Sequence, residues 1–91
     1  MNIKITDFAR WQLRLTLQDL RGKRNPEASA LAERTRDLLS DPTRLQELTQ
    51  PLASMPRLPV VEVVLGKYHL YFREVEDTLW LTGLWPPLYD E

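Results

Sequence analysis

Cysteine is absent from this 91-residue sequence. Without a thiol, the chain can form neither a disulfide nor a thiolate metal site. Proteins of the reducing cytoplasm ordinarily do without disulfides. The composition therefore predicts a cytoplasmic protein whose stability depends on one packed core.

Glycine and histidine are also scarce, with three glycines and a single histidine, His69. A phosphate-binding loop needs several glycines close together, and these three are far apart. One imidazole with no thiolate gives no support for a metal site. We therefore expect no bound metal and no cofactor.

Neither sign of charge dominates, because 12 Lys and Arg residues stand against 13 Asp and Glu residues, for a net charge of −1. Nucleic-acid binders usually carry a positive excess, since contacts with phosphate supply much of their affinity. Direct DNA binding by the chain alone is therefore not expected. No apolar run reaches the roughly 20 residues of a membrane span, and no signal peptide is visible at the N-terminus.

The length predicts a single domain, residues 1–91, and the 43% hydrophobic content is that of an ordinary globular protein. Residues 2–6 alternate as in a short strand. Helical spacing of apolar residues follows over 7–21, and the segment 22–26 ends this helix with Gly, Asn and Pro. A second helix is predicted from Pro26 to about Leu39, with a short turn through Leu48 after it.

The first predicted helix has an unusually broad apolar face, which suits packing on both a sheet and a second helix. Its two adjacent apolar sides are formed by Phe8, Trp11 and Leu15 and by Leu13, Leu17 and Leu20.

Three strands are predicted in the C-terminal part, at Val60–Leu65, Tyr68–Val75 and Thr78–Trp85, with two-residue turns between them. Before them, the prolines of 49–59 predict an irregular crossing, because proline donates no hydrogen bond to a ladder. In the last strand, simple alternation places Leu79, Leu81 and Trp85 on one face and Trp80, Thr82 and Leu84 on the other.

The predicted fold is therefore α+β, in the order β-α-α-β-β-β. It has a small antiparallel sheet and an N-terminal helical hairpin packed on one face. The first strand joins either the edge of the sheet or the last strand, and the sequence leaves this open.

Residues 65–81 carry a more specific pattern. They read Leu-Gly-Lys-Tyr-His-Leu-Tyr-Phe-Arg-Glu-Val, followed by an acidic turn and an aliphatic strand. This resembles the RelE/ParE superfamily of bacterial toxins, whose members tend to read Gly-Arg-Tyr-Arg-aliphatic-x-aromatic-Arg-Val. The helical hairpin at 7–39 fits the same family. The resemblance implies the toxin of a type II toxin–antitoxin system, neutralised by a cognate antitoxin.

The family has two branches with different mechanisms. RelE-like members are ribosome-dependent mRNA endoribonucleases, whereas ParE-like members bind and inhibit DNA gyrase. The ribonuclease branch supplies basic residues from its C-terminal hairpin and C-terminus. In this chain those positions fall on Val60, Glu62, His69 and the segment 88–89. Since a carboxylate repels phosphate, the resemblance favours the ParE-like branch, which is not enzymatic.

Three functions therefore remain as hypotheses. The first is a ParE-like gyrase inhibitor. The second is a RelE-like ribonuclease with a degenerate site, for which His69 and Tyr89 are the candidate catalytic residues. The third is a non-toxic antitoxin-binding module of the same fold. The alternative for His69 is an ordinary solvent-side strand residue beside Tyr71 and Arg73, and we favour that interpretation.

Two surfaces are candidates for binding. The predicted target-binding residues follow the first helix and its tip: Arg10, Arg14, Arg21, Lys23 and Arg24. The same stripe is typical of the solvated side of an amphipathic helix. The predicted antitoxin-binding residues lie on the sheet face away from the helices: Tyr71, Arg73, Trp80, Thr82 and Leu84. An alternative is that 49–59 or 86–91 covers this face. A homodimer and a toxin–antitoxin hetero-oligomer both stay open.

Overall fold

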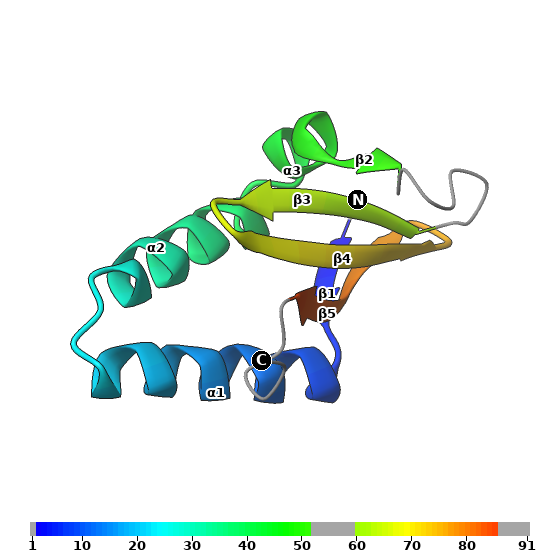
Figure 1. Cartoon of the computed structure of the whole chain (residues 1–91). Coiled ribbons are helices and arrows are strands. Elements are labelled where there is room, and N and C mark those ends of the chain that lie inside the picture. The colour runs from blue at the N-terminus through cyan, green and yellow to red at the C-terminus, as the bar shows by residue number, and fades with distance from the viewer. Residues whose placement is uncertain (1, 52–59, 86–91) are drawn as a thin grey trace.

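The computed structural model describes residues 2–51 and 60–85, along which a strand, three helices and four further strands follow one another (Figure 1). Their bounds are β1 (Asn2–Ile5), α1 (Asp7–Gly22), α2 (Glu27–Leu39), α3 (Pro42–Leu48), β2 (Gln50–Pro51), β3 (Val60–Leu65), β4 (Tyr68–Val75) and β5 (Thr78–Trp85).

The strands form one sheet in the order β1-β5-β4-β3-β2. β1 runs parallel to β5, and every other neighbouring pair is antiparallel. The first strand thus lies at the edge of the sheet and beside the last strand, which satisfies both alternatives left open by the sequence. The α+β class is confirmed, and the three C-terminal strands have the predicted bounds.

The helices pack on one face of the sheet, called the inner face here (Figure 1). One hydrophobic cluster joins all three helices to this face, which confirms the predicted packing of the helical hairpin. Its members include Ala9 and Leu20 of α1, Leu31 and Leu38 of α2, Leu45 of α3, and Leu70, Phe72, Leu79 and Leu81 of the sheet.

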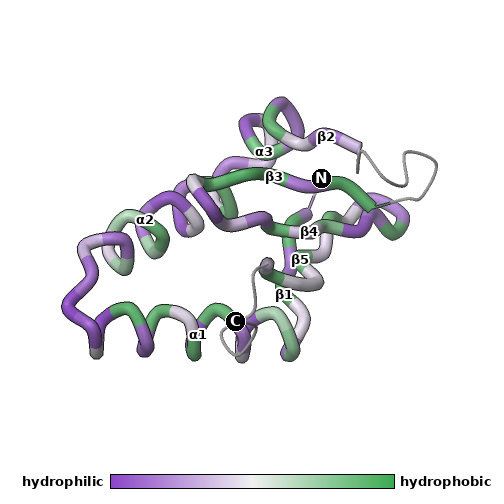
Figure 2. Tube along the Cα trace, viewed as in Figure 1, coloured by the Kyte–Doolittle hydropathy of each residue, from purple (hydrophilic) through white to green (hydrophobic). Residues whose placement is uncertain are grey.

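The broad apolar face predicted for α1 is wrong on one side. Phe8 and Trp11 are 54% and 48% exposed, and their ring centroids are 6.0 Å apart. The buried residues of the helix are instead Ala9, Thr16 and Leu20. Figure 2 shows the resulting alternation of hydrophobic and hydrophilic residues along α1. Two aromatic rings are thereby left at the surface.

The segment after α2 is more regular than its prolines predict. Asp41 caps α3, accepting a hydrogen bond from the Arg44 amide at 3.1 Å, and Leu45 of this helix is 0% exposed. Gln50 and Pro51 then pair antiparallel with β3, so the expectation of an irregular crossing was wrong for these two residues. Proline is tolerated there because β2 is an edge strand. Residues 52–59 lie outside the described part of the chain.

The alternation predicted for β5 fails after Thr82. Tyr71 pairs with Gly83 but Phe72 pairs with Leu81, so Thr82 is an extra residue in a β-bulge. The bulge exchanges the two faces beyond it. Leu84 is consequently buried in the inner face at 4% exposed, and Trp85 points outward at 48% exposed. Simple alternation predicted the opposite direction for both side chains.

One buried polar group has no partner among the described residues. The Thr35 side chain of α2 is 3% exposed, and its hydroxyl makes no hydrogen bond. Since a buried unpaired hydroxyl is unfavourable by about 1–3 kcal/mol, we expect Thr35→Val to raise the free energy of unfolding by about 1 kcal/mol. Urea unfolding followed by circular dichroism measures this.

The matched control for that prediction is Thr82→Val, because the Thr82 hydroxyl donates to the Tyr71 carbonyl oxygen at 3.2 Å. The same chemical change should lower the stability there, since it removes a hydrogen bond. Equal effects of the two variants would contradict the assignment of Thr35 as unpaired.

None of the helices in 2–51 and 60–85 is both long enough and apolar enough to cross a lipid bilayer.

Candidate functional site

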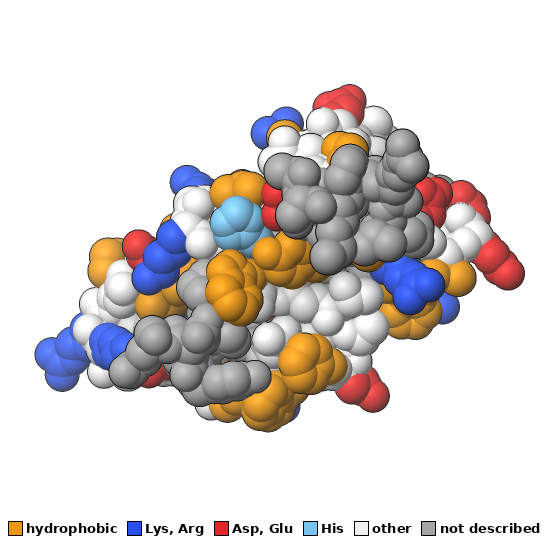
Figure 3. Space-filling model, turned by 45° about the vertical axis from the view of Figure 1, so that its right-hand side comes forward, with side chains coloured by type: hydrophobic (Ala, Val, Ile, Leu, Met, Phe, Trp, Pro, Cys, Tyr) orange, Lys and Arg blue, Asp and Glu red, His pale blue; other side chains and the backbone are white. Residues whose placement is uncertain are grey.

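The outer face of the sheet, turned away from the helices, carries polar and aromatic side chains. Pairing of the strands brings these residues side by side: Lys4 of β1, Glu62 and Val64 of β3, His69, Tyr71 and Arg73 of β4, and Trp80, Thr82 and Trp85 of β5. In Figure 3 the His side chain, in pale blue, lies among hydrophobic side chains on this face. The face combines exposed apolar side chains with one hydrogen-bonded pair of a histidine and a glutamate.

A side-chain hydrogen bond joins His69 and Glu62. The Nδ1 atom of His69 lies 3.1 Å from Oε2 of Glu62 across the β3–β4 ladder. The Glu62 side chain is only 15% exposed, and the His69 side chain is 36% exposed. The carboxylate therefore orients the imidazole ring and leaves its Nε2 atom without a contact to Glu62.

Tyr71 completes this cluster from the next outward position of β4. Its ring stacks near that of His69, with centroids 6.4 Å apart and planes inclined by 17°. Burial raises the pKa of the Tyr71 phenol above its usual value, and the negative charge of Glu62, its cross-strand partner, raises it further. The phenol therefore stays protonated and is a hydrogen-bond donor at neutral pH.

Trp85 joins the outer face because of the bulge in β5. It pairs with His69 across the strands and exposes 48% of its surface. The sequence analysis missed it, although Thr82-Gly83 within a strand is a usable signal, since glycine in a strand often marks a bulge. Leu84, predicted to contact an antitoxin, is buried on the inner face instead. The predicted position of Leu84 on the outer face was wrong, because the bulge reverses the direction of its side chain.

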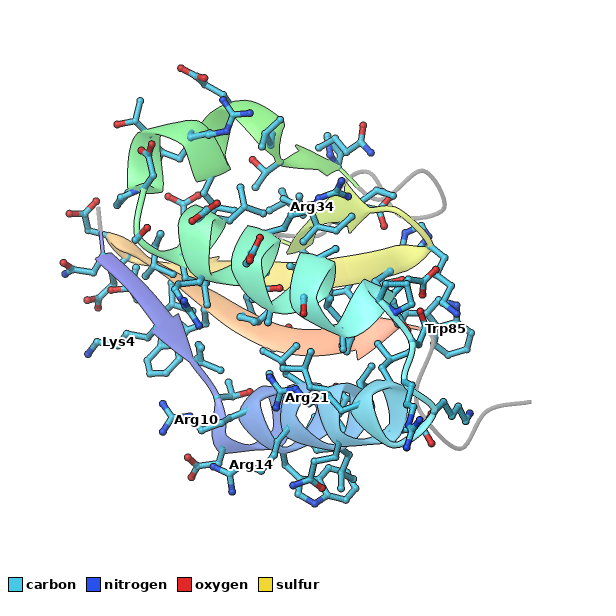
Figure 4. All side chains as sticks on the ribbon, turned by 90° about the vertical axis from the view of Figure 1, so that its left-hand side faces the viewer. Lys4, Arg10, Arg14, Arg21, Arg34 and Trp85 are labelled. Atoms are coloured by element: carbon cyan, nitrogen blue, oxygen red, sulfur yellow. The ribbon has the colours of Figure 1, made fainter. Side chains whose placement is uncertain are left out.

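The other four predicted antitoxin contacts lie on the outer face. Trp80 is half-buried and pairs with Arg73 across the strands. The ammonium group of Lys4 lies 5.5 Å from the centre of the Trp80 ring, in cation–π geometry (the residue is labelled in Figure 4). Together with Tyr71 and Thr82, these residues form one continuous surface over β4 and β5.

The two basic residues of the β3–β4 hairpin lie away from His69. Lys67 of the β3–β4 turn lies 3.6 Å from Glu27 of α2 and over the Tyr68 ring. Arg73 is on the same strand as His69 but four residues further, which is about 13 Å along an extended chain. Neither residue can share a phosphate with His69 in this arrangement.

The predicted target-binding residues lie away from the outer face, on the helical hairpin. All five are exposed. Figure 4 shows Arg10 and Arg14 projecting from α1 and Arg21 further along the same helix. At the tip, Lys23 forms an ion pair with Asp19 at 2.9 Å, and Arg24 adopts a left-handed backbone with a φ of 54°. The structure thus leaves this basic stripe at the surface.

No protein-family model, curated protein or solved structure matches this chain.

The geometry around His69 limits the reactions that the outer face can support. His69 oriented by Glu62 can transfer a proton, but no described group near it is placed to stabilise a negatively charged phosphate. No cluster of three or more metal-binding side chains occurs within 2–51 and 60–85. Tyr89, the second candidate catalytic residue, lies outside the described residues. The exposed aromatic and aliphatic area is better suited to holding a partner than to phosphate chemistry.

Proposed function

We propose that this protein is the toxin of a bacterial type II toxin–antitoxin system and acts in the cytoplasm by binding its target. The proposal takes the ParE-like branch of the resemblance, with DNA gyrase as the target by analogy with that branch and a cognate antitoxin as its inhibitor. The observation that carries it is the pair of Glu62 and His69, 3.1 Å apart, at positions where the ribonuclease branch has cations.

RNA cleavage by attack of a 2′-hydroxyl requires cations beside the phosphate that accumulates charge. Here a carboxylate stands at that place, and its charge opposes the approach of phosphate. The nearest basic side chains are either engaged with Glu27 or about 13 Å along the strand. These contacts favour binding over catalysis.

Two separate surfaces support two binding roles. The outer face, with Tyr71, Trp80 and Trp85, offers the aromatic anchors that are common in protein interfaces. The stripe of Arg10, Arg14 and Arg21 offers a second, basic surface on α1. We assign the antitoxin to the outer face and the target to the basic stripe.

The test is induced expression in a bacterial host, followed by a supercoiling assay with purified gyrase. We expect filamentation with DNA-damage signalling, and direct inhibition of gyrase. The double variant Arg10→Glu/Arg14→Glu should weaken inhibition by about tenfold or more, equivalent to 1.4 kcal/mol of binding free energy. Its thermal stability should be unchanged, because both residues are exposed.

The control is Arg34→Glu/Arg44→Glu, which makes the same change of charge at exposed positions of α2 and α3. Equal loss of inhibition in both double variants would show a nonspecific effect of charge and count against the stripe. No growth defect on expression would contradict the toxin and favour the non-toxic module.

The ribonuclease remains a second candidate because a histidine oriented by a carboxylate is a common arrangement for proton transfer. If it is correct, expression stops translation rapidly and leaves cut mRNA. The His69→Gln variant should then abolish cleavage, whereas it should leave gyrase inhibition intact under the first proposal.

A further inference from the structure

A third surface lies between α1 and α2, apart from the outer face and sharing only Arg21 with the basic stripe. It is an open groove of about 460 Å³, called the helical groove here. Its floor is apolar and its rim is basic. The residues that matter to the argument are Leu13, Leu17 and Arg21 of α1 and Thr35, Arg36 and Leu39 of α2.

Thr35 is the first sign that this groove holds a ligand. Only 3% of this residue is exposed, yet its hydroxyl has no hydrogen-bond partner among the described residues. Buried polar groups are nearly always paired in folded proteins. Because Thr35 lines the helical groove, a polar atom that enters there can supply the missing partner.

The two arginines are the second sign. Arg21 and Arg36 stand in the last turns of α1 and α2, and both are exposed. Neither forms an ion pair with any part of the chain that the structure describes. Two unpaired guanidinium groups beside an apolar floor complement a ligand that has carboxylates beside apolar side chains.

The shape of the groove selects among such ligands. It is open along the surface, whereas a small amphiphile is usually enclosed on most sides. Its walls are two helices, which offer no free strand edge, so a bound segment must satisfy its own backbone hydrogen bonds as a helix does. A second copy packed symmetrically through this groove would bring Arg21 and Arg36 against their own counterparts, which is unfavourable.

We propose that the helical groove binds an acidic amphipathic helix of a partner protein. The apolar side chains of that helix lie against Leu13, Leu17 and Leu39, its carboxylates pair with Arg21 and Arg36, and a polar atom bonds to the Thr35 hydroxyl. This inference does not require that the protein be toxic or that it bind gyrase.

The test uses the whole purified protein and two synthetic peptides of about 16 residues, long enough to form a helix on a surface. One carries leucines at helical spacing flanked by glutamates, and the other has lysine in place of every glutamate. Fluorescence anisotropy measures their affinities. We expect the acidic peptide to bind at least about tenfold more tightly. Amide shifts in NMR spectra should change around Leu17, Thr35 and Leu39.

Variants of the protein locate the site. Arg21→Glu/Arg36→Glu should weaken binding of the acidic peptide by about tenfold or more, since it reverses both rim charges. Thr35→Val should weaken it by about threefold, the value of one hydrogen bond, while the free protein becomes more stable. The control Arg34→Glu should bind as the parent does, because Arg34 lies on the other flank of α2 beside Leu65 and Gly66.

Each of five results overturns the proposal. The first two are equal affinities for the two peptides and a rim variant that binds as well as the parent. Shifts confined to Tyr71, Trp80 and Trp85 would place the peptide on the outer face. Sedimentation that finds a dimer broken by Leu17→Glu would assign the groove to a second copy. Binding of dodecanoate, without binding of either peptide, would assign it to a small amphiphile.

Discussion

The Phe72→Ala variant is expected to lose about 3–5 kcal/mol of its free energy of unfolding. Phe72 lies on β4, which has a paired strand on each side, and its side chain is 0% exposed on the inner face. Removal of the ring leaves a cavity at the centre of the cluster that joins the helices to the sheet. A domain of this size has a total stability of about 5–15 kcal/mol, so the variant should be close to unfolding.

Urea unfolding followed by far-UV circular dichroism measures this loss. The control is Val75→Ala on the same strand, where the side chain is 46% exposed and the change should stay within about 0.5 kcal/mol. A loss below about 1 kcal/mol for Phe72→Ala would mean that the core closes around the gap or that Phe72 is not central to it.

The second large effect is expected from Gln12→Leu. The Gln12 side chain accepts a hydrogen bond from the Leu84 amide at 3.0 Å and donates to the Leu84 carbonyl oxygen at 3.4 Å. β1 pairs with β5 only as far as Leu81, and Thr6 ends that ladder. The amide of Gln12 thus takes the place of a neighbouring strand along the next part of β5.

Leucine at position 12 has a similar size but no polar atoms, so both backbone groups of Leu84 lose their partner. We expect a loss of about 2 kcal/mol, because a part-buried backbone group without a partner is unfavourable by 1–3 kcal/mol. Hydrogen exchange of the Leu84 amide should also accelerate, since this amide depends on Gln12 alone among the contacts described.

Gln18→Leu is the control for this prediction, because Gln18 is exposed on the same helix. It should leave both the stability and the exchange of Leu84 unchanged. If Gln12→Leu behaves like the control, the side chain does not hold the edge of β5. A larger effect on Trp85 fluorescence than on global stability would indicate that Gln12 mainly positions the outer face.

The candidate site was only partly predictable. The outward direction of His69, Tyr71 and Arg73 follows from alternation along β4, which the structure confirms. The pairing of His69 with Glu62 was not predicted, because it depends on the register between β3 and β4. Trp85 was missed and Leu84 misplaced for one reason, the bulge at Thr82-Gly83. A single extra residue exchanges the two faces of a strand beyond it.

The helical groove was also only partly predictable from the sequence. Leu31, Thr35 and Leu38 lie on the buried side of α2, whereas the apolar spacing of α1 wrongly placed Phe8 and Trp11 in the core. Nothing in that spacing reveals that the Thr35 hydroxyl lacks a partner, or that Arg21 and Arg36 flank one groove. Those facts depend on how α1 and α2 lie against each other.

What the sequence by itself determined is local: the bounds of β3, β4 and β5, the helical hairpin, and the α+β class. These features depend on turns of two residues and on periodicity within one element, where neighbours in sequence are also neighbours in space. The tertiary structure alone decided the parallel pairing of β1 with β5, the surface position of Phe8 and Trp11, and the bulge that brings Trp85 beside His69. Each of these depends on which surfaces meet across long stretches of chain, because packing selects the face and register that bury the most apolar area.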